Sequence, residues 1–523
     1  MDGPVAPTSA TADPQSVLES VFGFTEFRPG QRKVIDTVLS GRDCIAVMPT
    51  GAGKSITFQI PARILPGAVL VISPLISLMK DQVDALVRLG FRATVLNSTI
   101  DFDERRRRLA ALRAGEFELL YLAPEALEGS LRGLIADCNV SLVVVDEAHC
   151  ISHWGHDFRP AYRKLGGLKQ ELGDIPVLAL TATATRRVAG DIIRQLGMRK
   201  PDGFKGSFFR SNLRITAHKK GGENKRDTRR DLLGIIARHA DESGIVYCMS
   251  RRSVDSTTAW LRERGVRALP YHAGLDDDAR AAAQDAFARD EADVIVATVA
   301  FGMGIDKSNV RFVVHRDMPR SIEAWYQEIG RAGRDGLPSD CVLFYSWADV
   351  IGYDAFLDAF DDPAMREETR RKTVEMFRLV DRGGCRHQGL LRYFDEAMEP
   401  CGTSCDVCRG EGIDTLVVAV PKHATARRPR DFKLAAPSAD ARAAAGAFGS
   451  PEEALRFDRL RAVRKQLADA EGVPAYIVFS DAVLRGMAAR VPRSRSELLL
   501  IPGIGPVKLE RYGEAFLAAL REG

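Results

Sequence analysis

Short apolar runs alternate with amphipathic stretches through the first two fifths of the chain. Apolar runs of four or five residues predict buried strands at residues 44–48, 69–73, 93–96, 119–122, 142–145 and 177–180. Between them, apolar positions follow helical spacing, for example Leu78, Val83 and Leu86. This alternation predicts an α/β fold in which helices cover a parallel sheet, with ligands at the carboxyl ends of its strands.

A second strand–helix series follows a charged and polar stretch. Residues 205–230 have the composition of an inter-domain connection. After them, strands are expected at residues 244–248, 267–271, 294–297, 311–315 and 341–345. The chain therefore contains two α/β lobes in series.

The first predicted strand runs into a glycine-rich turn typical of a phosphate-binding loop. Glycines let the backbone curl so that its N–H groups point at phosphate oxygens, a lysine reaches the β- and γ-phosphates, and a serine holds Mg²⁺. The expected nucleotide ligands are Thr50, Gly51, Gly53, Lys54 and Ser55. Met48 stands where the general signature has glycine, so a glycine turn before an ordinary helix is the alternative.

Two further segments favour a nucleotide site. Asp146 and Glu147 follow the strand at residues 142–145; Asp146 suits a Mg²⁺ contact, and Glu147 suits the base that orients attacking water. Before the first strand, the amide of Gln31 could pair with a base edge, and Phe24 and Arg28 could stack on the base. A helix cap beside a core phenylalanine is the alternative for this second segment.

Candidate nucleic-acid contacts follow two of the predicted strands. Ser77 and Lys80 offer donors to a phosphate backbone. Trp154, Phe158 and Arg159 lie just after the acidic pair, where bases could stack on aromatic rings at ~1–3 kcal/mol each. The alternative for the aromatic residues is a role in the core.

The second lobe lacks a phosphate loop but carries two arginines three residues apart, Arg331 and Arg334. On a helical turn they would face one way and could stabilise charge on a γ-phosphate held by the first lobe, with Arg334 the stronger candidate. The segment containing Gly304 and Asp306 is expected to contact the nucleotide as well. Solvated arginines are the alternative reading of this pair.

Four of the nine cysteines cluster near residue 400. Thiolates at this spacing suit structural Zn²⁺ in tetrahedral geometry, and the expected ligands are Cys385, Cys401, Cys405 and Cys408. Four buried or free thiols are the alternative.

Composition narrows the class of protein further. A net charge of +4 restricts any nucleic-acid surface to a local patch. No run approaches a membrane span, and the first residues do not resemble a signal peptide. Residues 1–14 have the composition of a disordered tail.

These motifs occur in an order that resembles the RecQ family of superfamily 2 helicases. The resemblance covers residues 20–345 and also includes residues 181–183 and 271–275. It implies two RecA-like lobes, adenine recognition by Gln31 with Arg28 and Phe24, and ATP-dependent 3′→5′ DNA unwinding in DNA recombination and repair. It also implies that Trp154, Phe158 and Arg159 couple DNA binding to hydrolysis. The family shares the Met48 departure, and a bacterial member would be cytoplasmic and associated with the nucleoid.

The C-terminal part departs from that pattern. A typical member continues into a winged-helix domain, whereas residues 411–450 are rich in alanine, arginine and proline and are interpreted as a linker. Residues 451–523 resemble an HRDC domain, in which Lys508 beside a Gly-Ile-Gly turn could contact a DNA phosphate. A plain helix–helix connection is the alternative for that turn.

The expected domains are a first lobe at 15–205, a second lobe at 206–348, a zinc subdomain at 349–410, and the linker and HRDC-like domain. ATP, Mg²⁺ and Zn²⁺ are the expected cofactors, with single-stranded and tailed duplex DNA as partners; repair or single-strand-binding proteins are possible further partners. Rival functions are a translocase or annealing factor with poor unwinding, a non-catalytic DNA-binding scaffold, and an enzyme that acts on RNA.

Overall fold

The computed structural model describes residues 13–521 apart from 75, 98–99, 128–129, 153–154, 156, 222–225, 303–306, 358–362, 419–439 and 441–447. Two compact units divide at Ser207 and Phe208, and the last helices are shared between the units. Of the expected segments, most of the tail and most of the linker lie outside the described residues.

The first lobe is a seven-stranded parallel sheet in the order β3-β4-β2-β5-β6-β1-β7. Its strands are β1 Cys44–Val47, β2 Ala68–Ile72, β3 Ala93–Leu96, β4 Leu119–Leu122, β5 Val140–Val145, β6 Val177–Thr181 and β7 Asp202–Lys205. Strands β1, β2, β4 and β6 are buried along their whole length, which explains why they read as unbroken apolar runs. The six strands expected from the sequence are therefore confirmed, and only β7 was not foreseen.

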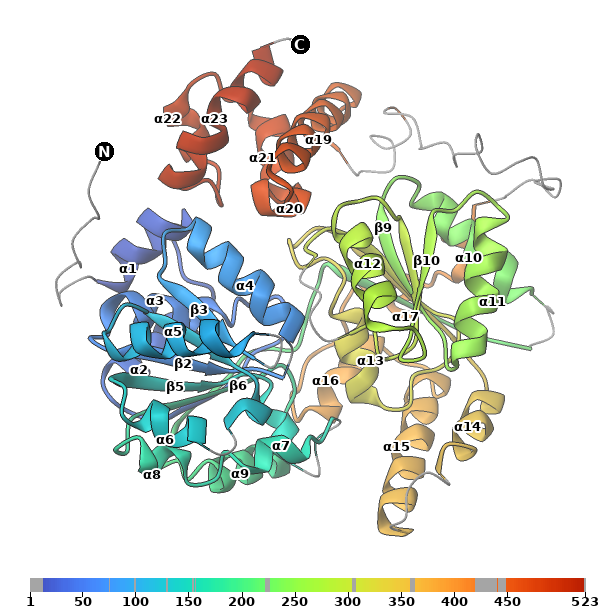
Figure 1. Ribbon diagram of the computed structural model, residues 1–523. Coiled ribbons are helices and arrows are strands. Elements are labelled where there is room, and N and C mark those ends of the chain that lie inside the picture. The colour runs from blue at the N-terminus through green and yellow to red at the C-terminus, as the bar shows by residue number, and fades with distance from the viewer. Residues whose placement is uncertain are drawn as a thin grey trace. The chain divides into compact units, whose positions relative to one another are not determined.

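Helices lie on both faces of this sheet (Figure 1). They are α1 Pro14–Val17, α2 Gln31–Leu39, α3 Ile56–Ile64, α4 Ile76–Arg88, α5 Phe102–Arg113, α6 Ser130–Ala136, α7 Pro160–Arg163, α8 Leu168–Glu171 and α9 Arg186–Gln195. Short π and 3₁₀ segments accompany them at η1 Leu18–Phe22, η2 Pro124–Leu127 and η3 Ala148–Ile151. The core between helices and sheet is apolar, with Val34, Phe58 and Leu142 among its buried members.

The second lobe is a six-stranded parallel sheet in the order β10-β11-β9-β12-β13-β8. Its strands are β8 Leu213–Lys219, β9 Ser243–Tyr247, β10 Ala268–Tyr271, β11 Val294–Ala297, β12 Val310–His315 and β13 Ser339–Tyr345. Helices α10 Thr228–Arg238, α11 Arg251–Arg262, α12 Asp277–Ala288 and α13 Ile322–Ile329 connect them.

The interpretation of residues 205–230 as a connection is partly wrong. Strand β8 occupies Leu213–Lys219 and pairs with β13 along its whole length. It forms the edge of the sheet and buries only part of its residues, so its sequence lacks a continuous apolar run.

A small helical module follows the second lobe, with α14 Trp347–Asp354, α15 Pro363–Asp381, α16 Arg386–Tyr393, α17 Asp406–Arg409 and η5 Ile413–Thr415. It is tied to β8, because Ser404 O accepts from Ile215 N at 2.9 Å and the Asp406 carboxylate accepts from Ala217 N at 3.0 Å. Arg386 forms a buried two-bond ion pair with Asp406 at 3.0 and 3.1 Å. The module therefore packs against the second lobe and forms part of the same compact unit.

Five helices end the chain: α19 Pro451–Glu471, α20 Ala475–Val478, α21 Asp481–Arg490, α22 Arg495–Leu499 and α23 Pro506–Arg521. Buried Arg464 of α19 pairs with Asp481 at 2.8 Å and donates to the Phe479 carbonyl at 2.8 Å, fixing α19 against α20 and α21. No helix in the described part of the chain has the length and apolarity needed to cross a membrane.

Candidate functional site

The loop after β1 has the curled backbone expected of a phosphate-binding loop. Gly51 and Gly53 have φ values of 84° and 79°, which side chains rarely tolerate. Ala52 N donates to Pro49 O at 3.0 Å, closing the turn, and Ser55 stands at the N-cap of α3. Lys54 and Ser55 therefore lie where the loop meets the positive end of a helix, as a phosphate site requires.

Gln31 and Arg28 contact this loop directly. The Gln31 amide donates to Gly53 O at 2.9 Å and accepts from Arg28 N at 2.8 Å, while the Arg28 guanidinium donates to Gly51 O. A Cβ added at Gly53 would lie 2.4 Å from Gln31 Nε2, so the close approach requires glycine. Phe24 is partly buried against the apolar cluster around Ile35. Gln31 and Arg28 thus lie beside the loop and contact its backbone carbonyls, and their contact with a base stays a prediction.

The acidic pair lies at the carboxyl end of β5, in reach of the lysine. Lys54 Nζ and Glu147 Oε1 are 3.8 Å apart. Desolvation, and then the neighbouring Glu147 carboxylate, raises the pKa of Asp146 to about 6, although Lys54 lowers it. A buried carboxylate beside a second carboxylate favours a bound cation, so the donor set formed by Asp146 with Ser55 fits Mg²⁺.

Glu147 has a left-handed backbone, with φ 46° and ψ 44°. A non-glycine residue in this region is uncommon and strained, and such strain clusters at functional sites. Its side chain lies beside His149, whose Nδ1 is 3.3 Å from Glu147 Oε2 and forms a 2.9 Å hydrogen bond with Thr181 Oγ1. Thr181 Oγ1 also accepts from Thr183 N at 3.2 Å. His149 therefore lies between the hydroxyl of Thr181 and the carboxylate of Glu147.

Two further residues of this site, His149 and Tyr162, were not predicted from the sequence. Tyr162 is buried and its hydroxyl donates to the Asp146 carbonyl at 2.9 Å. The Asp-Glu-Ala-His order could have indicated His149, but no local pattern pointed to Tyr162, which lies sixteen residues further on.

The candidate DNA contacts are only partly described. Trp154 and the side chain of Ser77 lie outside the described residues, and Lys80 is exposed on α4. Phe158 lies 5.7 Å from the Arg163 guanidinium. Arg159 pairs with Asp157 at 3.1 Å and donates to Pro74 O at 3.1 Å, linking the two segments in which DNA contacts were predicted.

Arg331 and Arg334 follow α13 in a turn, so their expected helical placement is wrong. The helix ends at Ile329, and Gly333 has φ 57°. Arg331 is buried and would lie 2.8 Å from a Cβ added at Gly302, whereas Arg334 is partly exposed. Gly304 and Asp306 lie outside the described residues.

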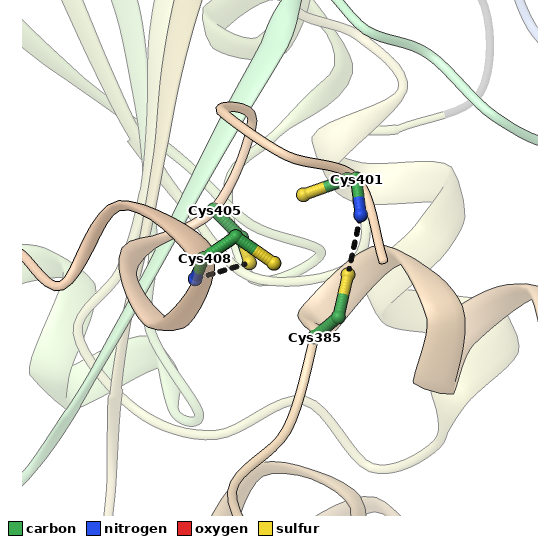
Figure 2. A group of neighbouring side chains, drawn as sticks. All are labelled: Cys385, Cys401, Cys405 and Cys408. Atoms are coloured by element: carbon green, nitrogen blue, oxygen red, sulfur yellow. Dashed lines mark hydrogen bonds between the residues drawn. The ribbon is translucent and has the colours of Figure 1, made fainter. Parts of the chain in front are cut away.

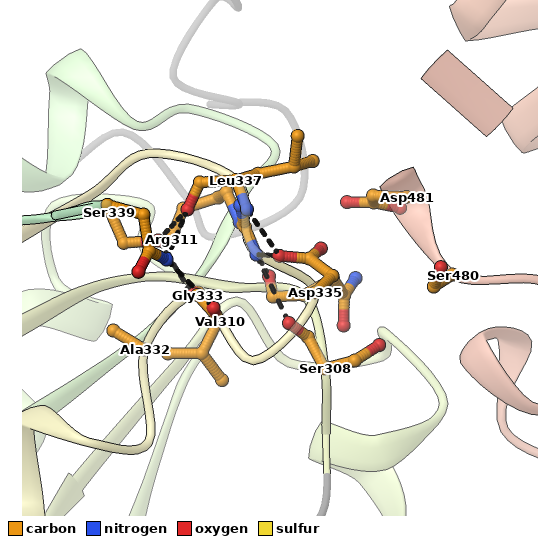
Figure 3. Close-up of polar contacts among 12 residues, drawn as sticks. Ser308, Val310, Arg311, Ala332, Gly333, Asp335, Leu337, Ser339, Ser480 and Asp481 are labelled. Atoms are coloured by element: carbon orange, nitrogen blue, oxygen red, sulfur yellow. Dashed lines mark hydrogen bonds and ion pairs between the residues drawn. The ribbon is translucent and has the colours of Figure 1, made fainter. Parts of the chain in front are cut away.

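Two other arginines hold this turn in place. Arg311 donates to Asp335 Oδ1 at 2.7 Å and to Ser308 O at 3.1 Å, and both charged side chains are buried (Figure 3). Arg210 donates to the carbonyls of Gly330 and Ala332 at 3.0 Å each. The sequence analysis missed Arg210, because it lies about 120 residues before the turn in a stretch interpreted as a connection.

The four cysteines come together as the spacing predicted (Figure 2). Their sulfur atoms all lie within 4.8 Å of one another. Backbone N–H groups donate to two of them, from Cys401 to Cys385 Sγ at 3.2 Å and from Cys408 to Cys405 Sγ at 3.5 Å. Four sulfurs bound at ~2.3 Å to one ion would have this mutual spacing, so the cluster fits a tetrahedral Zn²⁺.

Lys508 lies in the first turn of α23 and is partly exposed. Burial lowers the pKa of its ammonium group to about 8. Near neutral pH, a larger fraction of the Lys508 side chain is therefore uncharged than in a solvated lysine.

The chain has two α/β lobes, and the first carries a phosphate loop, an Asp-Glu-Ala-His segment and Thr181 bonded to His149. This combination defines a helicase of the DEAD/DEAH class. The chain matches the DEAD/DEAH box helicase family at residues 28–192 and the helicase conserved C-terminal domain at 225–336. It also matches the RecQ zinc-binding domain at 347–409 and the HRDC domain at 453–520.

The chain belongs to the RecQ family of ATP-dependent DNA helicases. It is 38% identical to the ATP-dependent DNA helicase RecQ of Haemophilus influenzae, over 97% of this chain and 95% of that protein. It is also 38% identical to the Bacillus subtilis protein of that name, over 97% of this chain and 98% of the relative. The resemblance stated from the motifs is thereby confirmed, together with the α/β fold and the helicase activity.

Solved structures with the same fold are more distant in sequence. The DUF1998 helicase MrfA bound to DNA has a TM-score of 0.53 and 17% identity, covering 65% of this chain and 52% of that one. The DEAD-box helicase Mss116 bound to single-stranded RNA has a TM-score of 0.53 and 18% identity, covering 68% and 79%.

Proposed function

We propose that the first lobe binds ATP·Mg²⁺ and that its hydrolysis drives 3′→5′ movement along single-stranded DNA and duplex unwinding in recombination and repair. The observation that carries this proposal is the cluster at the carboxyl edge of the first sheet, where Lys54 of the curled loop lies 3.8 Å from Glu147. Such a cluster combines a phosphate-binding lysine with a base for water.

Each side chain then has one role. Lys54 and the loop N–H groups hold the β- and γ-phosphates, and Thr50 is part of the same loop. Gln31 contacts the adenine together with Arg28 and Phe24. Ser55 and Asp146 would hold Mg²⁺, which neutralises charge on the phosphates. Glu147 orients the attacking water, and its orientation is supported by His149, which lies between Glu147 and Thr181.

The second lobe supplies Arg331 and Arg334 to the terminal phosphate, with Arg334 the finger. Its partial exposure suits a residue that must reach a ligand, whereas Arg331 is buried against Gly302. Gly304 and Asp306 contribute nucleotide contacts from the same lobe. The four cysteines hold Zn²⁺ as a structural ion, since they are tied to β8 through their backbone neighbours.

DNA would be contacted by Ser77, Lys80, Trp154, Phe158 and Arg159, with Lys508 as an auxiliary contact. Replacing Trp154 by alanine should weaken DNA stimulation of hydrolysis more than it weakens basal turnover. An equal loss in both would favour a packing role for the indole.

The direct test is DNA-dependent phosphate release by the full chain. Lys54→Ala should abolish it, because the lysine supplies charge to the phosphates that no neighbour replaces. Retained hydrolysis would contradict the assignment of the loop, and stimulation by RNA equal to that by DNA would contradict the DNA preference.

A second candidate is a translocase or annealing factor that separates strands poorly. The alignment with the Haemophilus influenzae relative extends over 595 residues, more than the 523 of this chain, so the relative carries segments without a counterpart here. A missing winged helix between residues 410 and 450 would be one such segment. Strand displacement on 3′-tailed, 5′-tailed and blunt duplexes separates the two functions and reports polarity.

A further inference from the structure

A polar cleft of about 490 Å³ lies where the zinc module meets the second lobe. Its walls come from the residues before β8, the residue before β13, and the chain around α17 and η5. Strands β8 and β13 are parallel, so the cleft is at the amino-terminal edge of the sheet. Ligands of parallel sheets bind at the opposite, carboxyl edge, and this cleft is therefore separate from the helicase motifs of the lobe.

Three arginines line the cleft: Arg214, Arg238 and Arg409. Arg409 is held by Glu411 at 2.8 Å and by the Thr403 carbonyl at 3.2 Å. Arg238 donates to the Thr415 carbonyl at 3.0 Å. These bonds fix two of the guanidinium groups at the wall.

Arg214 differs from the other two, because its guanidinium group makes no hydrogen bond or close ion pair with the described residues, and Asp340, opposite it on β13, is influenced by its charge only at longer range. The only carboxylate that lines the cleft is that of Glu411, while Asp340, 3.7 Å from Arg238, already accepts from His239 at 3.0 Å. With Asp340 counted beside Glu411, three guanidinium groups lie near two carboxylates, which leaves a local excess of one positive charge.

We propose that this cleft binds a backbone phosphate of DNA outside the strand that the motor grips. Guanidinium groups recognise phosphate through paired, charge-assisted N–H bonds, and Thr403 adds a hydroxyl at the rim. The phosphate comes from the duplex arm or from the displaced strand, which present the same phosphodiester. The proposal rests on the DNA helicase activity of the chain, because only a DNA-bound protein meets such a phosphate at high local concentration.

Arg214 is the residue to change, because it is exposed and its loss removes no internal bond. Equilibrium binding of a blunt duplex and of oligo(dT) is measured on the full chain without nucleotide, over a series of salt concentrations. Arg214→Gln should weaken binding about fivefold near 0.15 M salt and lower the salt slope by ~0.9, as the loss of one phosphate contact does. Arg214→Lys, which keeps the charge, should restore most of the affinity.

Arg289→Gln is the matched control, because Arg289 is also exposed on the second lobe and lines no part of this cleft. A loss confined to the duplex assigns the phosphate to the duplex arm, and a loss confined to oligo(dT) assigns it to the displaced strand. If Arg214→Gln matches Arg289→Gln on both DNAs, the proposal is overturned. Hydrolysis at saturating oligo(dT), measured on the same samples, keeps this result distinct from a failure of the motor assignment.

Discussion

The two sheets follow the same strand order but carry different chemistry. Placed side by side, β10-β11-β9-β12-β13-β8 repeats β3-β4-β2-β5-β6-β1, so β8 occupies the place of β1. After β1 the chain forms the glycine loop with Lys54, whereas after β8 it continues into Lys220. Lys220 pairs with Asp349 at 2.8 Å and Asp317 at 3.3 Å. One fold thus places a lysine in the candidate phosphate loop of one lobe, whereas in the other lobe the lysine anchors helix α14.

This difference shows that function is decided in the loops that follow equivalent strands. Lys54 lies 3.8 Å from one carboxylate, whereas Lys220 contacts two, and the second lobe also contains ion pairs that are buried. Arg311 with Asp335 is one example, with side chains 4% and 0% exposed.

The largest expected effect is on hydrolysis, and it comes from replacing Arg334 of the second lobe. Arg334→Ala should lower kcat for DNA-stimulated hydrolysis by about 10³, the lower end for an arginine finger, with nucleotide affinity little changed. Arg334→Lys should not restore it, since an ammonium lacks the planar fork. A change in affinity alone, measured by nucleotide titration, would indicate a ground-state contact instead.

Loss of a cysteine ligand should destabilise the second lobe and leave the stability of the first lobe unchanged. Cys405→Ser breaks the cluster beside β8, where Ile215 bridges to Cys405, so amide exchange in Leu213–Lys219 should accelerate while β1 is unchanged. A loss of even ~2 kcal/mol would lower the melting temperature by about 4–8 °C.

The matched control is Cys138→Ser, which alters a buried thiol of the first lobe outside the cluster. If this variant and Cys405→Ser respond alike to a chelator, the cysteine cluster is not a metal site.

The smallest effect concerns the buried charges of the second lobe. Burial lowers the pKa of His239, but hydrogen bonds with Asp340 and Glu242 outweigh it and raise the pKa to about 9. The imidazolium therefore adds stability in full below the unfolded value of about 6.5, and this contribution is lost as pH rises through about 9.

Melting temperatures measured from pH 6 to pH 10 should show this loss in the wild type and a flatter profile in His239→Gln. Parallel profiles would mean that the imidazole is not charged in the fold.

The sequence predicted eleven of the thirteen strands, because buried parallel strands read as apolar runs. It missed β7 and β8 for the same physical reason: each lies at an edge of its sheet and is only partly buried, so neither reads as an apolar run. The phosphate loop and the cysteine cluster were predictable because their ligands are close in sequence. His149 with Thr181, Tyr162 with Asp146, and Arg210 with the arginine turn were not, since only the folded sheet brings them together.

The central claim is that the first lobe holds the triphosphate and that an arginine of the second lobe completes the nucleotide site by contacting the terminal phosphate. A structure of the chain with ADP, Mg²⁺, aluminium fluoride and single-stranded DNA tests it most directly. The account predicts the Arg334 guanidinium within hydrogen-bonding distance of the fluoride, with Glu147 next to the attacking water. An Arg334 side chain directed into solvent in that complex would contradict it.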